Sequence, residues 1–371
     1  MIIKSNLIVL KTFLLVVFLM MVSCKSDAGS SGKPTPNPNV PDAPKASFDD
    51  ATGKGEVGRV KFDMVSIAEI KDGKIGYEGA ENNGIRSISL TAYKMLESEV
   101  TQELFTAVMG INPSFYTNTG IKQYEFNGEL VDYDTNVDEG EVQEKRPVEQ
   151  VSWYQAIAFC NKLSILCNRE PCYVVKIDDK PIDFAQLKFE DIPAVDNSDE
   201  ENKKEKIIKQ WDALTLDINK NGFRLPTEAE WEWAAKGGHE HEWSGTNVLD
   251  ELKQYAWYID TDHNLNEPNP IDPKRKLHET KKKKPNAYGL YDMSGNCCEW
   301  CWDWFTEGEN STPEGGQDPL GATDGTDRSI RGGCFDDKYD LVTRMFRYKS
   351  RPPFKTPEGR PGVLGFRFVC R

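Results

Sequence analysis

Four cysteines in the C-terminal part of the chain could supply thiol or metal chemistry. Cys297, Cys298 and Cys301 form the run C-C-x-x-C, and Cys334 directly follows Arg331-Gly-Gly333. In a reducing compartment such a run is typical of zinc ligands or redox-active thiols. In an exported chain, thiols are more often paired or buried. The sequence leaves the connectivity of the nine cysteines open.

The compartment is indicated by the N-terminal segment, residues 1–23. It carries two lysines and no acid, and Thr12–Val22 is an unbroken apolar run. This run is too short for a transmembrane helix, which needs about 20 residues, and it is typical of a secretory signal peptide. The run ends in Met21-Val22-Ser23-Cys24, which resembles a bacterial lipobox. The resemblance predicts cleavage before Cys24 and its lipidation; the alternative is an ordinary signal peptide with an incidental cysteine.

Residues 24–56 separate this segment from the rest of the chain. They are rich in Ser, Gly, Pro, Lys and Asp, a composition that buries little apolar area and stays extended or disordered. We therefore predict a tether over 24–56 and a folded domain over 57–371. Because several acyl chains anchor a protein stably, we expect a lipid-anchored protein of the cell envelope, on the periplasmic face or the outer surface.

Composition limits the classes of partner. The chain has 371 residues, enough for one large or two small domains, with 46 basic and 60 acidic residues and a net charge of −14. A general nucleic-acid binder needs a basic face, so no nucleic-acid partner is expected. A mean hydropathy of −0.61 excludes a polytopic membrane protein.

Helix starts are marked by capping residues. Ser152 and Thr227 each open a capping box, and the helix after Thr227 ends at Gly237-Gly238. Thr101 can cap a shorter helix over 102–109. The sequence therefore predicts modest helices that are separated by long stretches without helical period.

Strands and turns account for most of the remaining chain. Apolar alternation predicts strands over 60–70 and 85–93. Residues 117–145 are acidic and 178–209 highly charged, and we predict both as surface insertions in loop conformation. The expected fold class is a single α+β domain, irregular and rich in turns.

Several longer motifs occur in order along the folded part. They are RPVEQVSW (146–153), GFRLPTEAEWEWAAKGG (222–238), NAYGLYDMSGN (286–296), EW (299–300), RGG (331–333) and GFR (365–367). Together they resemble the formylglycine-generating enzyme, or sulfatase-modifying factor, family. The resemblance runs from about Val57 to Arg371 and implies a single α+β domain related to C-type lectins, with little regular structure.

The same resemblance implies that the family's oxidation chemistry is missing. Members that make formylglycine carry a Cys pair after the RGG turn, which binds copper and oxidises a substrate cysteine with oxygen. The corresponding positions here are Asp337 and Val342. Neither residue supplies a thiolate, so copper is not expected as a cofactor.

Two further departures fall in the pocket that the resemblance implies. Cys298 stands where the family has a Trp, and Cys334 where it has a Ser. We expect these thiols to be neighbours, either cross-linked or reduced and poised for a metal. Trp300 and Arg331 complete the candidate pocket.

The resemblance also implies a structural calcium site. Its predicted ligands are the side chains of Asp292 and Glu299 and the backbone carbonyls of Gly295 and Cys297. Oxygen ligands from a short irregular segment suit calcium. The alternative is that Asp292 and Glu299 hydrogen-bond to turn amides.

Two functions follow from these observations. The first is a binding or assembly module at the cell envelope, whose partner is an envelope protein or a glycan and whose membrane contact is the lipid anchor. The alternative is a divergent oxidase that acts on a protein or peptide substrate through Cys298 or Cys334.

Overall fold

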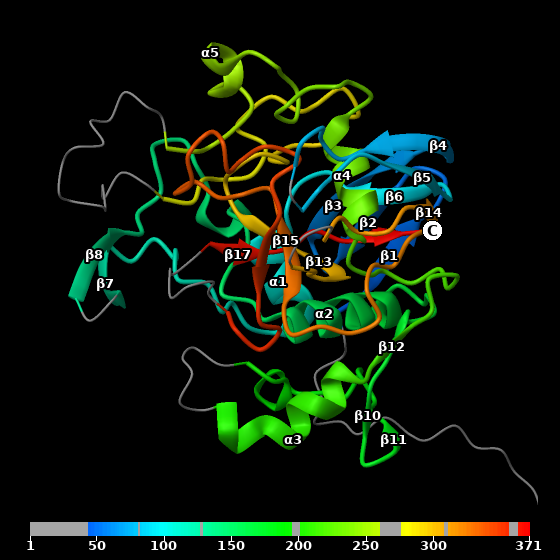
Figure 1. Cartoon of the computed structure of the whole chain (residues 1–371). Coiled ribbons are helices and arrows are strands. Elements are labelled where there is room, and N and C mark those ends of the chain that lie inside the picture. The colour runs from blue at the N-terminus through cyan, green and yellow to red at the C-terminus, as the bar shows by residue number, and fades with distance from the viewer. Residues whose placement is uncertain are drawn as a thin grey trace, which may run out of the picture. The chain divides into compact units, whose positions relative to one another are not determined.

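The computed structural model describes residues 44–80, 82–126, 129–194, 201–259, 276–307, 311–355 and 363–371 (Figure 1). The predicted signal peptide, Cys24 and most of the predicted tether lie outside these ranges. Within them, no helix is both long and apolar enough to cross a membrane. Residues from Ala43 onward form one unit of helices and strands, which confirms the predicted α+β domain.

An antiparallel five-stranded sheet joins the two ends of this domain. Its order is β1-β2-β3-β6-β18, in which β3 is Val60–Ile67, β6 is Tyr93–Leu96 and β18 is Val369–Cys370. Phe62 and Met64 of β3 are buried, as the apolar alternation predicts. Because β18 pairs with β6, the end of the chain lies beside strands from its beginning.

The first two strands correct the predicted boundary of the tether. β1 (Ala46–Asp49) and β2 (Lys54–Val57) form a hairpin that extends the sheet, so the folded part begins by Ala46 and not at Val57. Phe48 explains the difference, because its ring stacks on Phe62 with centroids 6.0 Å apart. One half-buried aromatic residue thus fixes a segment whose overall composition is that of a linker.

Smaller sheets surround this one. A four-stranded sheet has the order β16-β15-β13-β17, and a three-stranded sheet the order β14-β5-β4. Their strands are β4 (Ile70–Ile75), β5 (Arg86–Leu90), β13 (Cys298–Trp304), β14 (Gly316–Gln317), β15 (Arg328–Arg331), β16 (Tyr348–Ser350) and β17 (Leu364–Gly365). The predicted strands over 60–70 and 85–93 are therefore β3 and β5, each shorter than predicted.

The helices begin where the capping residues predict. α1 is Gln102–Met109, α2 is Trp153–Leu166 and α4 is Glu228–Lys236. Both capping boxes form, at Ser152 and at Thr227, and α4 ends at Gly237 in the left-handed conformation. Each cap satisfies backbone N–H groups that the first turn leaves unpaired.

Both predicted loop insertions contain regular structure instead. The first contains the hairpin of β7 (Ile121–Phe126) and β8 (Glu129–Asp134), and the second includes most of α3 (Glu201–Asp212), which extends three residues beyond it (Figure 1). Trp211 of α3 is buried, with its ring 5.6 Å from that of Tyr154 on α2. A single aromatic anchor stabilises a helix that its charged composition does not predict.

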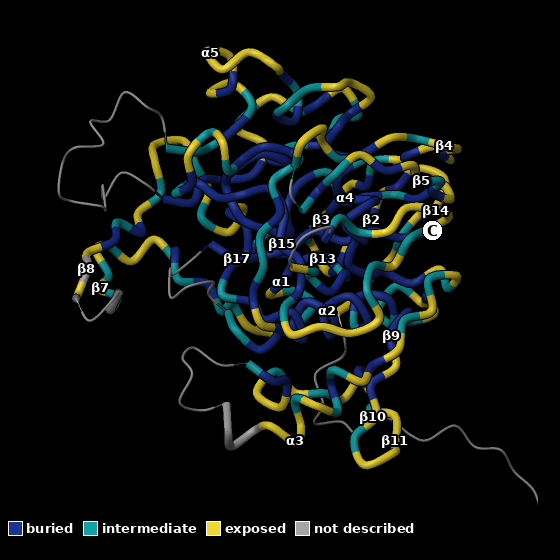
Figure 2. Tube along the Cα trace, viewed as in Figure 1, coloured by how far each residue is buried: buried dark blue, intermediate teal, exposed yellow. Residues whose placement is uncertain are grey.

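The remaining short elements are β9 (Tyr173–Val174), β10 (Lys176–Ile177), β11 (Lys180–Pro181), β12 (Thr215–Leu216), α5 (Leu249–Leu252) and two 3₁₀ turns, η1 (Gln143–Lys145) and η2 (Phe189–Asp191). Figure 2 shows exposed chain at α5 and β10–β11 and buried chain through the body of the domain. The core has two main parts: one contains α2 and β13, and the other contains α4 with β4 and β5.

Candidate functional site

Strand β13 carries three of the predicted site residues, Cys298, Glu299 and Trp300, and divides them between its two faces. Side chains alternate along a strand, so Cys298 and Trp300 share one face, and Glu299 and Cys301 share the other. Cys298 and Trp300 pack in the core that contains α2, whereas Cys301 packs in the core that contains α4. The cysteines of the C-C-x-x-C run therefore do not converge on one centre.

Cys298 lies beside Cys334 instead, as the sequence predicts. One ligand atom each of Cys298, Cys334 and Asp337 lies within 4.8 Å of the other two. The exposed fractions of the three residues are 2%, 0% and 7%. A carboxylate oxygen of Asp337 accepts the backbone N–H of Cys334 at 2.9 Å, which fixes the turn between them. None of the described cysteines forms a disulfide.

Val342, at the second position of the family's Cys pair, lies in an apolar cluster, and its side chain has no polar atom to offer a metal or substrate. Val342 is fully buried in a small apolar cluster with Trp243, Leu252 and Ala256. Gly333, at a φ of 67°, packs on Val342, and a Cβ there would lie 2.9 Å from a Val342 methyl group. Val342 is therefore a packing residue beneath the RGG turn.

The other two pocket candidates have structural roles. The indole N–H of Trp300 donates to the carbonyl oxygen of Val151 at 2.8 Å. Arg331 does not line the cysteine pocket, because β15 pairs it directly with Glu299 and places it on the opposite face from Cys298. Its guanidinium donates to Glu232 at 2.8 Å.

Arg331 belongs to a buried ion network under α4. Glu228 accepts two hydrogen bonds from Arg347, at 2.8 and 2.7 Å, and a weaker one from Arg331 at 3.3 Å. Arg86 lies 3.8 Å from Glu232. Burial raises the pKa of Glu228, but Arg347 and Arg331 outweigh it and lower that pKa to about 2. These charges compensate one another, so the network stabilises the fold.

The predicted calcium ligands lie in a second buried group of carboxylates. Both oxygens of Glu299 accept from Arg367 at 2.7 Å, and one also accepts the indole N–H of Trp231 at 2.8 Å. One oxygen of Asp292 accepts the backbone N–H of Lys281 at 2.8 Å. Glu299 is thus already well paired, whereas Asp292 is paired through one oxygen only.

Glu99, which the sequence analysis missed, completes this group. Among the described residues, neither of its carboxylate oxygens has a hydrogen-bond partner, and neither does Oδ1 of Asp292. Burial, together with the charge of Asp292, raises the pKa of Glu99 well above its usual value. Burial also raises the pKa of Asp292 to about 6. Unpaired buried carboxylate oxygens are costly unless a cation binds them, so this group fits a hard cation such as calcium.

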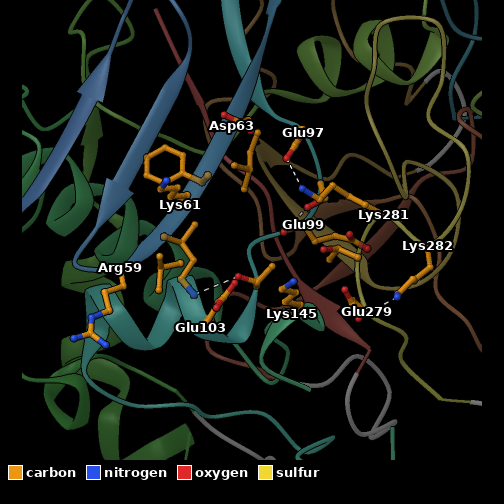
Figure 3. Close-up of a pocket in the computed structure, with 17 residues that line it drawn as sticks. Arg59, Lys61, Asp63, Glu97, Glu99, Glu103, Lys145, Glu279, Lys281 and Lys282 are labelled. Carbon is orange, nitrogen blue, oxygen red and sulfur yellow. Dashed lines mark hydrogen bonds and ion pairs between the residues drawn. The ribbon is translucent and has the colours of Figure 1, made fainter. Parts of the chain in front are cut away.

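A pocket with a volume of about 510 Å³ lies over Glu99 (Figure 3). Its charged residues are Arg59, Lys61, Lys145, Lys281 and Lys282, together with Asp63, Glu97, Glu99, Glu103 and Glu279. Lys281 pairs with Glu97 at 2.6 Å, and Lys282 with Glu279 at 3.4 Å. Because both signs are intermixed along the wall, a ligand with hydrogen-bond donors and acceptors fits it better than a simple ion.

Two more polar residues without full partners lie near the cysteines. The hydroxyl of Tyr116 and one carboxylate oxygen of Glu149 are buried, and neither has a partner among the described residues. The other oxygen of Glu149 accepts the backbone N–H of Tyr116 at 2.9 Å, and burial raises the pKa of Glu149 to about 7. Tyr116 lies outside the sequence motifs and was not predicted as a site residue. Glu149 lies within the motif RPVEQVSW, which is the one sequence signal that could have identified it.

The fold and this arrangement define a sulfatase-modifying factor domain that lacks its Cys pair. Residues 56–371 match the sulfatase-modifying factor enzyme 1-like domain, and the chain belongs to this family.

Three similar proteins come from different bacteria. The chain is 34% identical over 247 residues to the chaperone protein LppX of Paenibacillus barcinonensis, and this match covers 62% of this chain and 68% of that protein. It is 34% identical over 170 residues to the formylglycine-generating enzyme of Streptomyces coelicolor, and this match covers 42% of this chain and 49% of the enzyme. The structure of Treponema denticola variable protein 1 matches with a TM-score of 0.70 and 44% identity, over 86% of this chain and 98% of that one.

Proposed function

We propose that this protein is an exported lipoprotein that uses its sulfatase-modifying factor domain as a binding or assembly module at the cell envelope. The observation that carries the proposal is the loss of the Cys pair. Asp337 stands at the first position, and Val342 at the second is fully buried in an apolar cluster. A two-thiolate copper centre cannot form from these side chains.

The relatives support the same proposal. Two relatives match over most of their own length: a protein named as a chaperone over 68%, and another named as a variable protein over 98%. The formylglycine-generating enzyme matches over only 49% of its length. That last match favours the alternative, a divergent oxidase that uses Cys298 or Cys334.

Copper loading and oxygen consumption separate the two functions. The reduced chain is loaded with copper and mixed with a cysteine-containing peptide, and the formylglycine product and oxygen uptake are measured. The binding-module proposal expects no turnover: neither formylglycine nor oxygen uptake beyond that of peptide and copper alone. Turnover that depends on Cys298 or Cys334 would overturn it in favour of the oxidase.

The mixed-charge pocket of Figure 3 is the surface that we propose for the ligand, an envelope protein or a glycan. Its volume lies within the range of about 300–1,000 Å³ that is usual for ligand pockets. Arg59 and Lys61 are exposed at its edge. Capture from native envelope should weaken for the double variant Arg59→Glu, Lys61→Glu. The control is Lys206→Glu, Lys209→Glu on α3, which should capture as wild type does.

The lipid anchor is part of the proposal and is tested separately. The lipid attaches at Cys24, before the first strand of the domain, so Cys24→Ala should give a folded protein that is released from membranes. Partition between membrane and soluble fractions after a high-salt wash measures this. A Cys24→Ala protein that stays with the membrane would show that the anchor lies elsewhere.

We also propose a structural calcium ion at Asp292 and the carbonyls of Gly295 and Cys297, with Glu299 beside it and Glu99 as a further carboxylate. The unpartnered oxygens of Glu99 and Asp292 support this proposal. When bound, the ion supplies positive charge to a buried group that has one guanidinium, Arg367, for three carboxylates. Its effect is to hold the segment before β13 in place.

A further inference from the structure

The cluster of Cys298, Cys334 and Asp337 offers two sulfur donors and one oxygen donor at a single point. The three donor atoms lie within 4.8 Å of one another. Zinc bonds are about 2.3 Å to sulfur and about 2.0 Å to carboxylate oxygen, so two ligands of one tetrahedral ion lie about 3.5–3.8 Å apart. Binding one ion therefore requires the three donors to move together by no more than roughly 1 Å.

The surroundings of this cluster also indicate a bound group. The hydroxyl of Tyr116 and an oxygen of Glu149 are buried without a partner among the described residues. The ring of Tyr116 packs edge-on against Phe335, with centroids 5.6 Å apart, and Phe335 is the neighbour of Cys334 in the chain. Buried polar groups are normally hydrogen-bonded, so the unpartnered hydroxyl of Tyr116 close to Cys334 indicates an additional partner there.

We propose that Cys298, Cys334 and Asp337 bind one Zn²⁺ ion, with the fourth tetrahedral position held by water. This site goes beyond the binding-module function and does not depend on it. It also differs from the family's Cys pair, since only Asp337 stands at a position of that pair and it contributes oxygen in place of sulfur.

The donor set favours zinc over calcium and over Cu(I). Calcium takes oxygen ligands alone, and Cu(I) prefers thiolate and thioether sulfur. Zinc accepts cysteine sulfur and carboxylate oxygen together in a tetrahedral site. Three protein ligands leave a fourth position, and a water there can donate a hydrogen bond to the unpartnered hydroxyl of Tyr116.

Charge and protons balance without any oxidant. The two thiols lose their protons to solvent as the ion binds, because the thiolate is the ligand. Two thiolates and one carboxylate carry three negative charges, and Zn²⁺ leaves a net charge of −1. A Cys298–Cys334 disulfide would instead require a two-electron oxidant.

The consequence for the fold is a cross-link. Cys298 begins β13, and Cys334 and Asp337 lie in the turn that follows β15 and the RGG motif. A bound ion joins these two segments where the catalytic relatives have their oxidation centre. The site therefore stabilises the pocket wall through a metal.

The test uses the full chain, reduced, freed of metal by a chelator and then kept in excess calcium, with Zn²⁺ alone as the probe. We expect one zinc per chain at equilibrium, and X-ray absorption that shows two sulfur neighbours at about 2.3 Å. Asp337→Asn and Cys298→Ala should each weaken zinc affinity by roughly tenfold or more, because even changes to the hydrogen-bond partners of ligands cost about 10–100-fold. The absorption spectrum of the wild-type protein tests the ligands even where a variant does not fold.

The matched control is Cys301→Ala. Cys301 is fully buried on the same strand but packs in the other core, so its variant should keep the wild-type zinc affinity. Loss of zinc in Cys301→Ala would assign the metal to the C-C-x-x-C run and overturn the proposal. So would the absence of stoichiometric zinc, or a Cys298–Cys334 disulfide in an unreduced digest of the protein from native envelope.

Discussion

The domain buries two groups of carboxylates, and the positive charge available to each differs. Under α4, Glu228 and Glu232 meet Arg331 and Arg347 at hydrogen-bond distance, and Arg86 lies nearby. Before β13, by contrast, three carboxylates share one buried guanidinium, which Glu299 occupies with both oxygens. The first group is complete within the protein, whereas the second lacks positive charge.

The pKa values follow this difference. Glu228 is held near a pKa of about 2, because its arginines outweigh the effect of burial. Burial dominates at Asp292 and raises its pKa to about 6. Glu228 and Asp292 are equally buried, yet their pKa values shift in opposite directions. The difference lies in the number of cationic side chains that contact each carboxylate. A buried carboxylate that is unpaired in the protein indicates a ligand, and one that is fully paired indicates a structural role.

Breaking the complete group should have the largest effect. Arg331→Met leaves Glu228 and Glu232 buried with less compensation, and loss of one partner from a buried ion pair costs about 3–5 kcal/mol. Urea unfolding measures the change. The exposed pair of Lys206 and Asp178 serves as the control, since solvent screens it and Lys206→Met should have a much smaller effect. Equal costs for the two variants would contradict the assigned role of Arg331.

The same group should set the acid limit of stability. The folded-state pKa of Glu228, about 2, lies below its ordinary value of 4.5, so its contribution is complete above about pH 4.5 and is lost as pH falls towards 2. The free energy of unfolding of Glu228→Gln should lack this part of the pH dependence. An unchanged acid profile would mean that other carboxylates set the limit.

Calcium should act on the incomplete group alone. A ligand that binds only the native state adds roughly 2.7 kcal/mol at a hundredfold excess over Kd, so the melting temperature should rise in calcium relative to chelator. Asp292→Asn and Glu99→Gln should lose most of this rise. Asp303 is a suitable control, because it is also buried, and burial with the charge of Glu228 raises its pKa to about 7. Asp303→Asn should respond to calcium as wild type does, and equal melting temperatures of wild type in calcium and chelator would end the proposal.

The sequence predicts elements with strong local signals. The caps at Thr101, Ser152 and Thr227 are each confirmed, because a side chain and a nearby N–H settle the start of a helix. The hairpin that contains Phe48 and the helix that contains Trp211 were missed, since each depends on one aromatic residue meeting a distant part of the core.

The site shows the same limit. Motif position brings Cys298 to Cys334, which the structure confirms. It also assigned Arg331 to their pocket, which is wrong, because strand pairing turns that side chain towards α4. Glu99 lies about 190 residues before its partners in the chain, and only the tertiary fold brings it to Asp292. Spacing within a motif therefore predicts neighbours along one segment, but not the charges that other segments bring.

The smallest expected effect is also the sharpest test of the comparison, because the two groups should respond to neutral substitution with opposite sign. In chelator at neutral pH, Asp292→Asn removes an undercompensated charge while its amide oxygen can still accept the N–H of Lys281. We expect stability to stay level or to rise, because the neutral amide removes the cost of a desolvated charge. Glu228→Gln under the same conditions should destabilise, since it leaves Arg347 buried without its carboxylate. Urea unfolding of both variants gives the two signs directly. If Asp292→Asn in chelator destabilised as much as Glu228→Gln, the charge of Asp292 would already be compensated within the protein. The argument for a bound cation at the second group would then fail.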